Sequence, residues 1–219
     1  MPQRKIHLEK GKIYHILSKS IAGFKIFRDN SEYIRMKYLL KYYNSTTIPT
    51  KFSVFFRQKN KEQMLNEHSR KNKRLLEIIS YCFMPTHIHL ILKGLEDNAI
   101  SVFVKNILSS YSLYFNAKTK RKGPLWQSRF DNILVETDEQ LIHLSRYIHL
   151  NPVTAYLVDK PEDWDFSSYR EFLGEIEENE KICNYSDCLD IIPTEYKNFV
   201  NSQINYQREL AEIKRLWLE

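Results

Sequence analysis

Two histidines separated by one isoleucine are the residues of this sequence best suited to chemistry. His87, Ile88 and His89 lie in a run of β-forming residues, and successive side chains of a strand point to opposite faces of a sheet. Both imidazoles therefore share one face, where two neutral rings can hold a divalent metal ion. Such a pair is by itself more often two ordinary surface histidines, so the metal interpretation depends on the residues that accompany it.

A tyrosine and an amide further along the chain form a second group of polar side chains. Tyr147 and Asn151 are four residues apart, which places them one turn apart on the same face of a helix. His143, one turn before Tyr147, could orient the phenol or assist proton transfer, although a surface histidine is the simpler interpretation. Pro152 disfavours helical geometry at Asn151, so the helix should end or bend there, and Asn151 could equally be a C-cap.

A metal ion, a phenol and a basic chain together suggest cleavage of a DNA strand. A phosphodiester repels nucleophiles, so an enzyme needs a cation at the non-bridging oxygens and a nucleophile in line with the leaving oxygen. Deprotonating a phenol with a pKa near 10 costs about 4 kcal/mol at pH 7, a cost that a nearby metal ion lowers. Attack by Tyr147 would leave a 5′-phosphotyrosine and a free 3′-hydroxyl, and a second 3′-hydroxyl could then reverse the step on another strand.

The charge of the chain is divided unevenly along its length. Residues 1–130 carry 25 Lys and Arg against 8 Asp and Glu, a net charge of +17, whereas residues 131–219 carry 8 against 19, a net charge of −11. A surface of such positive charge attracts polyanions. The basic part of the chain is therefore the expected nucleic-acid surface.

The composition indicates a globular protein of the cytoplasm. With 219 residues, 42% of them hydrophobic, the chain can bury a substantial core. No apolar run approaches the roughly 20 residues that a membrane helix needs, and the first residues lack the apolar core of a signal peptide. The three cysteines form no Cys-x-x-Cys pair, so reduced thiols are expected. We expect a cytoplasmic, nucleoid-associated protein with no membrane contact.

The hydrophobic pattern predicts a chain that contains both strands and helices. Alternating or β-rich runs predict strands at 11–18, 75–83, 86–92 and 130–135, the middle two forming a hairpin. Helical spacing predicts helices at 32–43, 99–115 and from 137 through Tyr147. The polar, basic stretch 57–74 is interpreted as a solvated helix or a mobile arm.

Several basic residues are candidates for contacts with DNA. A loop that combines phosphate-neutralising charge with a stacking surface contains Lys118, Lys120, Arg121, Lys122 and, after a glycine, Trp126. Trp126 is at least as well explained as a core residue. Arg28 and Arg129 are further candidates, with a structural salt bridge as the alternative for each.

The order of these motifs resembles that of the REP-associated tyrosine transposases, which are single-tyrosine HUH (His-hydrophobic-His) endonucleases. The resemblance spans residues 10–173 and is carried by YHI at 14–16, IFRD at 26–29, YCFMP at 81–85, the His pair, GPLWQSRF at 123–130, YIHLNPV at 147–153 and WDFSSY at 164–169. The family implies an α+β fold with a central antiparallel sheet flanked by helices. This ferredoxin- or RRM-like core would carry the His pair on a middle strand and the tyrosine on a helix. It also implies a homodimer that acts on hairpin-forming or single-stranded DNA.

The resemblance assigns roles to the reactive residues. It implies that His87 and His89 are metal ligands, that Tyr147 is the nucleophile, and that Asn151 is the third ligand. An amide oxygen suits Mg²⁺ or Mn²⁺. Where relatives have an Asn-Arg-Gly-like segment after the first strand, this chain has Ser18-Lys19-Ser20, which leaves a DNA contact at that strand end open. Residues 1–157 should form the catalytic domain and residues 158–219 an acidic, mostly helical extension.

Three functional classes are compatible with these residues. The hypothesis that explains most of these residues is a metal-dependent single-stranded DNA endonuclease and strand transferase, a transposase. The alternative from another class is a DNA-binding protein, specific for a sequence or a hairpin, without physiological cleavage. A metal-independent two-histidine phosphodiesterase is disfavoured because such enzymes use two separated His-x-Ser/Thr motifs, and neither His87 nor His89 is followed by Ser or Thr two positions on.

Overall fold

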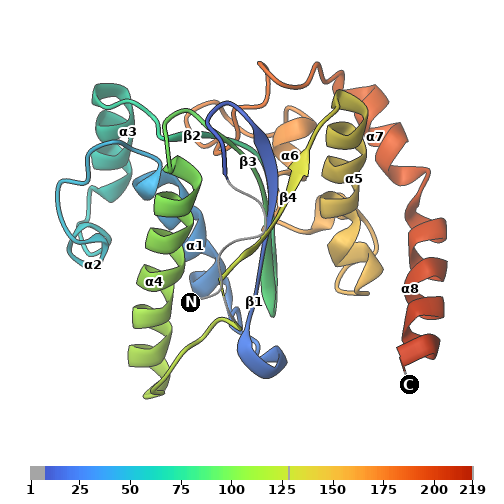
Figure 1. The fold of residues 1–219 in the computed structure, drawn as a ribbon, viewed down its shortest axis with the longest axis horizontal. Coiled ribbons are helices and arrows are strands. Elements are labelled where there is room, and N and C mark those ends of the chain that lie inside the picture. The colour runs from blue at the N-terminus through green and yellow to red at the C-terminus, as the bar shows by residue number, and fades with distance from the viewer. Residues whose placement is uncertain (1–7, 128, 219) are drawn as a thin grey trace.

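A four-stranded antiparallel sheet forms the centre of the molecule (Figure 1). The computed structural model describes residues 8–127 and 129–218. The sheet has the order β2-β3-β1-β4, and its strands are β1 (Ile13–Lys19), β2 (Leu76–Met84), β3 (His87–Gly94) and β4 (Asp131–Val135). The β-α-β-β-α-β succession with this order is that of a ferredoxin-like fold. The predicted α+β class and antiparallel sheet are confirmed.

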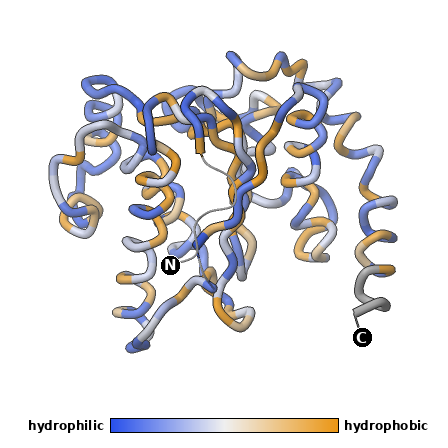
Figure 2. Tube along the Cα trace, in the orientation of Figure 1, coloured by the Kyte–Doolittle hydropathy of each residue, from blue (hydrophilic) through white to orange (hydrophobic). Residues whose placement is uncertain are grey.

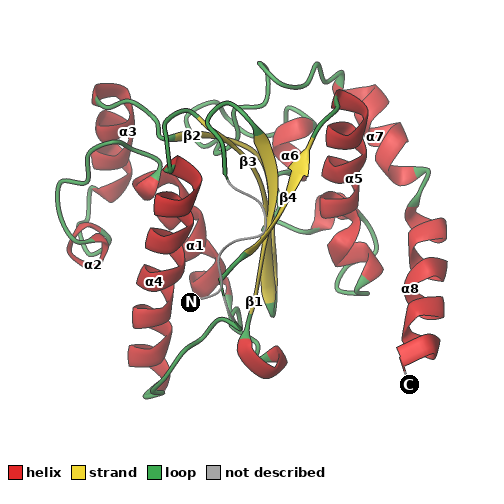
Figure 3. Ribbon diagram, in the orientation of Figure 1, coloured by secondary structure: helices red, strands yellow, loops and turns green. Residues whose placement is uncertain are grey.

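Helices cover both faces of the sheet (Figure 3). One group comprises α1 (Asn30–Tyr43), α2 (Phe52–Phe55), α3 (Lys61–Lys71) and α4 (Ala99–Thr119). The other comprises α5 (Asp138–Thr154), α6 (Tyr169–Phe172), α7 (Pro193–Asn201) and α8 (Ile204–Leu218), and short 3-10 turns occur at Ile21–Gly23 and Pro161–Asp163. Among the described helices none has the length and hydropathy needed to cross a membrane.

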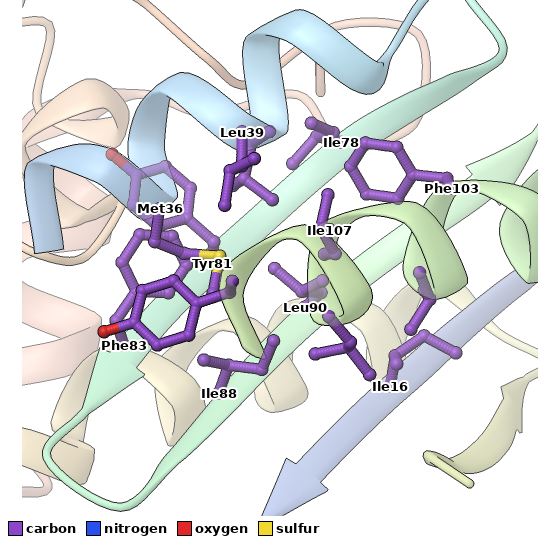
Figure 4. Packing of buried hydrophobic residues seen from close by; sticks show 14 of the residues in the cluster. Ile16, Met36, Leu39, Ile78, Tyr81, Phe83, Ile88, Leu90, Phe103 and Ile107 are labelled. Atoms are coloured by element: carbon purple, nitrogen blue, oxygen red, sulfur yellow. The ribbon is translucent and has the colours of Figure 1, made fainter. Parts of the chain in front are cut away.

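The alternation of side chains along the strands divides the core into two clusters. Ile88 and Leu90 point to the side of α1 and α4, where they pack with Phe103 and Ile107 (Figure 4). Ile91 points to the side of α5 and joins a separate cluster. Figure 2 shows hydrophobic residues along the central strands, while α3 is mostly hydrophilic. Each face of the sheet therefore has its own hydrophobic core.

The predicted local structure agrees with most of the observed elements. The hairpin is present, since β2 pairs with β3 in antiparallel register around a turn at Pro85 and Thr86. Within the basic stretch 57–74, the solvated-helix alternative is observed as α3, which is anchored by the buried Leu65. The sequence does not reveal α2, a single turn held by Phe52 and Phe55.

Of the expected end or bend of the helix at Asn151, the end is wrong. Helix α5 continues through Pro152 to Thr154, and its C-cap is Ala155. A proline removes one intrahelical hydrogen bond. Here Pro152 and Val153 are buried, and burial of their apolar surface offsets that loss. The uninterrupted helix keeps Tyr147 and Asn151 on one continuous face.

A buried polar network joins α5 to the sheet and to the C-terminal helices. His149 is fully buried. Its Nδ1 lies 2.7 Å from the hydroxyl of Tyr196 in α7, and its Nε2 lies 2.8 Å from Ser168 Oγ. Ser168 Oγ in turn lies 3.0 Å from Ser80 Oγ of β2. Because buried polar groups need partners, these contacts select one rotation of α5 about its axis.

The segment after α5 returns to the edge of the sheet. The amide of Phe83 donates to the Phe166 carbonyl, and the amide of Ser168 donates to the Tyr81 carbonyl. The buried carboxylate of Glu171 accepts hydrogen bonds from the Tyr81 hydroxyl and the Cys183 amide. These residues cover the outer edge of β2. The proposed division at residues 157 and 158 stays a prediction.

Acid should destabilise the fold partly through His149. Burial lowers the pKa of His149 to about 3, whereas an unfolded chain binds this proton near pH 6.5. Between these values the unfolded state binds more protons, so the free energy of unfolding should fall as the pH drops from 6.5 towards 3. Urea titrations of wild type and His149→Gln should show that the variant loses stability less steeply, by up to about 1.4 kcal/mol per pH unit. Parallel pH profiles would contradict a neutral His149.

Candidate functional site

The His pair lies in the middle of the sheet, on the face that packs against α5. In the antiparallel register with β1, His87 lies opposite Lys19 and His89 opposite Leu17, and directly paired residues share a face. His89 is 3% exposed, whereas His87 is only partly buried. The predicted placement of both imidazoles on one face of a middle strand is observed, with their ring centroids 5.0 Å apart.

A third histidine that the sequence analysis missed completes the imidazole group. His15 of β1 stacks on His89 with a centroid separation of 5.2 Å and an interplanar angle of 6°. Its Nε2 lies 2.9 Å from His89 Nδ1. The sequence pattern that could have revealed His15 is the alternation of β1, which puts His15 and Lys19 on one face. Only the strand register shows that this is the face with the His pair.

Local hydrogen bonds orient both imidazoles of the pair. His15 engages Nδ1 of His89, and Thr86 Oγ1 lies 3.0 Å from Nδ1 of His87. The contacts found among the described residues leave Nε2 of each ring for another partner. A histidine ligand is oriented in this way when its second nitrogen is held by a neighbour.

Burial keeps the three imidazoles neutral. It lowers the pKa of His15 to about 4. The pKa of His87 is lowered to about 4, first by burial and then by the charge of Lys19. Burial lowers the pKa of His89 well below its usual value, and the neighbouring charges act in the same direction. Neutral imidazoles present lone pairs, so the group is ready to bind a cation at neutral pH.

Tyr147 brings a phenol to the same place from α5. Its ring lies 5.9 Å from the His89 ring, almost perpendicular to it at 88°. The side chain is 43% exposed, so a macromolecular substrate can reach it. Partial burial raises the pKa of Tyr147, and the phenol is therefore protonated at neutral pH. A nucleophilic role requires a group that takes up this proton or that stabilises the phenolate left behind.

Asn151 lies one turn after Tyr147 in the interior of α5, so its alternative role as a C-cap is excluded. Its Nδ2 is buried without a hydrogen-bond partner. Rotation of the amide exchanges Nδ2 and Oδ1, so that the carbonyl oxygen can take this position. Within the described ranges no three His, Cys, Asp or Glu side chains are grouped to hold a metal ion. Two imidazoles and an amide oxygen remain a donor set that fits a divalent cation.

His143 does not contact Tyr147 in the described interactions. Its Nδ1 lies 2.9 Å from a terminal nitrogen of Arg146, and its ring packs edge to face on Phe199 of α7. These contacts direct His143 towards the C-terminal helices. They favour the simpler interpretation of this residue, a histidine on the surface of α5.

Two of the candidate DNA contacts have structural partners instead. Trp126 is 9% exposed and donates its Nε1 proton to the Leu108 carbonyl, so the core interpretation of Trp126 is confirmed. Arg28 forms an ion pair with the buried Glu32, which agrees with the salt-bridge alternative. Both side chains contact α4, Trp126 through the Leu108 carbonyl and Arg28 over the ring of Phe115.

The loop after α4 keeps basic groups at the surface. Lys118 belongs to the last turn of α4 and pairs with Asp29 and Glu32. Lys120 and Lys122 are exposed, and Arg129 lies exposed before β4. Arg121 donates to the Gly123 carbonyl. The exposed members of this loop remain candidates for phosphate contacts.

The comparison with protein families identifies one family. The family model described as "Transposase IS200 like" matches residues 37–151. This stretch, just over half of the chain, contains the His pair, Tyr147 and Asn151, whereas His15 precedes it.

Individual relatives agree with this family. A Haemophilus influenzae protein that bears the name of a REP-associated tyrosine transposase is 28% identical over 111 residues, 46% of this chain. The match spans 63% of that relative's length. A solved structure of a REP-associated tyrosine transposase bound to a REP hairpin superposes with a TM-score of 0.54. It is 17% identical, and the match covers 88% of this chain and 99% of that one. The structural likeness confirms the fold.

The neutrality of the imidazole group can be measured directly. In a ¹⁵N-edited NMR titration, the rings of His15 and His87 should titrate with midpoints near pH 4, because burial lowers both pKa values to about 4. Above pH 6 both rings should show the nitrogen shifts of neutral tautomers. A midpoint near the ordinary 6.5 for either ring would show that it is exposed to solvent and not packed as described.

Proposed function

The chain belongs to the family of IS200-like transposases, and from this premise we propose that it is a metal-dependent single-stranded DNA endonuclease and strand transferase. The observation that carries the proposal is the contact between Tyr147 and His89, which come from two different elements of the fold. A phenol and a pair of neutral imidazoles meet on one face of the sheet, and the unpartnered amide of Asn151 follows the phenol one turn later on α5. This is the set of groups that a tyrosine-based strand cleavage needs.

Three side chains of this set would hold the cation. His87 and His89 would donate Nε2, because their Nδ1 atoms are engaged by Thr86 and His15. Asn151 would donate its amide oxygen. When bound, Mg²⁺ or Mn²⁺ supplies positive charge to the scissile phosphate and lowers the cost of deprotonating a nearby phenol. The three proposed ligands are neutral and include no carboxylate. The phosphate of the DNA would therefore supply the negative charge that balances the cation.

Tyr147 would act as the nucleophile. Its Oη forms a bond to the phosphorus, the bond from phosphorus to the 3′-oxygen breaks, and the phenolic proton passes to solvent. The products are a 5′-phosphotyrosine and a free 3′-hydroxyl after that oxygen takes up a proton. Lys19, opposite His87 at the end of β1, contributes a cation near the phosphate. This position replaces the Asn-Arg-Gly-like strand end of the relatives.

The substrate would be a DNA strand that forms a hairpin. The structural relative is bound to a REP hairpin, and the basic first part of this chain provides the charge that such a ligand requires. The exposed Lys120, Lys122 and Arg129 would contact phosphates. We further propose a homodimer, as implied by the family resemblance, and association with the nucleoid through DNA.

Substitution of the nucleophile should abolish the covalent intermediate. Wild type is incubated with a labelled single-stranded hairpin oligonucleotide and Mn²⁺, and a denaturing gel should show a protein-DNA adduct. Tyr147→Phe should bind the DNA with unchanged affinity but give no adduct, because only the phenolic oxygen is removed. Tyr206→Phe removes another exposed tyrosine and should keep the adduct. An adduct in Tyr147→Phe would assign the nucleophile to a different residue.

EDTA should eliminate the adduct of wild type, and His87→Ala and His89→Ala should do the same. Activity that resists EDTA would remove the metal from the proposal. Tight hairpin binding by wild type without an adduct under any metal condition would instead assign the protein to the class of DNA-binding proteins without cleavage.

His15 should tune the affinity for the metal ion by holding His89. His15→Phe keeps a ring in the stack but removes the partner of His89 Nδ1, and loss of such an orienting hydrogen bond weakens metal binding by about 10- to 100-fold. Calorimetric titration of Mn²⁺ into the DNA-free protein measures this directly. His15→Gln, which retains a polar end at this position, should recover part of the affinity. Equal affinities of wild type and His15→Phe would reduce His15 to a packing residue.

A further inference from the structure

We propose that a pocket between α1, α2 and α4 binds the phosphate group of a nucleotide through Arg35. The pocket has a volume of about 680 Å³. It lies among the helices on the opposite side of the sheet from α5, and therefore away from Tyr147 (Figure 1). Neither the family match nor the proposed cleavage reaction assigns it a role.

The walls of the pocket carry positive charge only. Its described lining residues include four cations and no carboxylate. The remaining walls are aromatic rings, hydroxyls, an amide and the aliphatic side chains of Leu113 and Ala117. The lining comprises Arg35, Tyr43, Lys51, Phe52, Ser53, Phe56, Arg57, Asn106, Ser109, Ser110, Leu113, Tyr114, Ala117 and Lys118. This chemistry selects an anion that carries a flat or apolar portion.

Arg35 is the unusual member of this lining. It is only 9% exposed, and its Nε is buried without a hydrogen-bond partner. Its guanidinium lies between aromatic rings, with Cζ 4.1 Å from the centroid of Tyr114 and 4.7 Å from that of Phe56. The rings hold the guanidinium plane by cation-π contact but offer no acceptor in that plane. A buried donor such as this Nε is costly to leave without an acceptor, and a ligand in the pocket could supply one.

The nearest acidic residue on the same helix is used elsewhere. Glu32 precedes Arg35 by three positions in α1, a spacing at which the two side chains could pair. Its carboxylate instead bonds Arg28 and Lys118. The protein thus satisfies two exposed cations with its buried carboxylate and leaves the buried cation open. That arrangement keeps Arg35 available to an anion from outside.

A nucleotide phosphate fits these groups better than other anions. The planar guanidinium donates parallel hydrogen bonds to phosphate oxygens. Ser109 and Ser110 on α4 add hydroxyl donors, and Lys51 and Arg57 add charge. The partly exposed rings of Tyr43, Phe56 and Tyr114 provide aromatic surface on which a base can stack.

The expected source of the phosphate is the DNA strand itself, and this part of the inference rests on the proposed function. Lys118 borders the pocket and is followed directly by the exposed Lys120 and Lys122 of the loop that leads to β4. Basic side chains therefore extend from the pocket towards β4, with Lys118 paired to Asp29 and Glu32 and the exposed Lys120 and Lys122 beyond it. A DNA strand that passes from the face of Tyr147 around the β4 edge of the sheet would reach Arg35. A free nucleotide is the other source of the same group.

The test compares Arg35→Met with wild type. Methionine keeps an apolar side chain of similar length among the rings but removes the charge. Lys160→Gln, an exposed residue beyond α5, is the control for loss of one positive charge, and Arg57→Gln is a second pocket variant. Melting temperatures in phosphate-free buffer show whether each variant folds. Arg35→Met should melt at or above the temperature of wild type, since it removes an unpaired buried charge.

Binding of a hairpin oligonucleotide with single-stranded flanks is then measured at several salt concentrations. Arg35→Met should bind about tenfold more weakly and should lower the salt slope by about one. Arg57→Gln should show a smaller loss in the same direction, and Lys160→Gln should match wild type. Formation of the Tyr147 adduct on a short oligonucleotide that spans only the cleavage site should remain in Arg35→Met.

Thermal shifts with inorganic phosphate and thymidine monophosphate distinguish the two sources. If the mononucleotide stabilises wild type but not Arg35→Met while DNA binding is equal, the pocket takes a free nucleotide. If DNA binding alone responds to the substitution, the ligand is the strand. Equal DNA binding together with no mononucleotide response would overturn the phosphate pocket. If wild type neither binds DNA nor forms an adduct, the proposed cleavage is refuted. The thermal shift with thymidine monophosphate then still shows whether the pocket binds a phosphate.

Discussion

The pairing of β3 with a strand on each side is the constraint on which the candidate site depends. A central strand cannot slip by one residue without turning its apolar side chains away from the core. In β3 the buried Ile88 and Leu90 select one register with β1 and β2. The same register places His87 and His89 on the α5 face and sets His15 beside them. Hydrophobic burial on one face thereby determines the positions of the polar groups on the other.

The second requirement is that α5 presents the correct side to that face. Helix packing through apolar contacts alone permits small rotations, whereas buried hydrogen bonds are directional. His149 lies two positions after Tyr147 and bonds to Ser168 and Tyr196 at its two ring nitrogens. The phenol and the Asn151 amide then face away from this network. The C-terminal helices contribute to the site without contacting it, because they provide one of the partners of His149.

The sequence predicted the elements that carry periodic hydrophobic patterns and the residues that stand in motifs. Strand alternation was sufficient for the His pair and helical spacing for Tyr147 and Asn151, and both groups lie where these patterns put them. What could not be predicted depends on contacts between distant segments. His15 needed the strand register, and the burial of Trp126 needed the packing of α4. The Glu32 carboxylate that pairs with the nearby Arg28 also bonds the distant Lys118. The passage of α5 through Pro152 depended on tertiary burial, which local preference does not include.

The two hydrophobic clusters that the sheet separates have a consequence for the evolution of this protein. Residues in independent clusters make free-energy contributions that add, whereas residues within one cluster are coupled. The pocket around Arg35 belongs to the α1 and α4 side, and Tyr147 belongs to the α5 side. Substitutions around Arg35 that keep the strand register should therefore couple only weakly to substitutions around Tyr147, except near Trp164 and Tyr185, which pack against both clusters. Under the proposed function, the DNA sequence preferred by the pocket side could change while Tyr147 and the imidazoles are kept, and the Tyr147 side could be lost while DNA binding is kept.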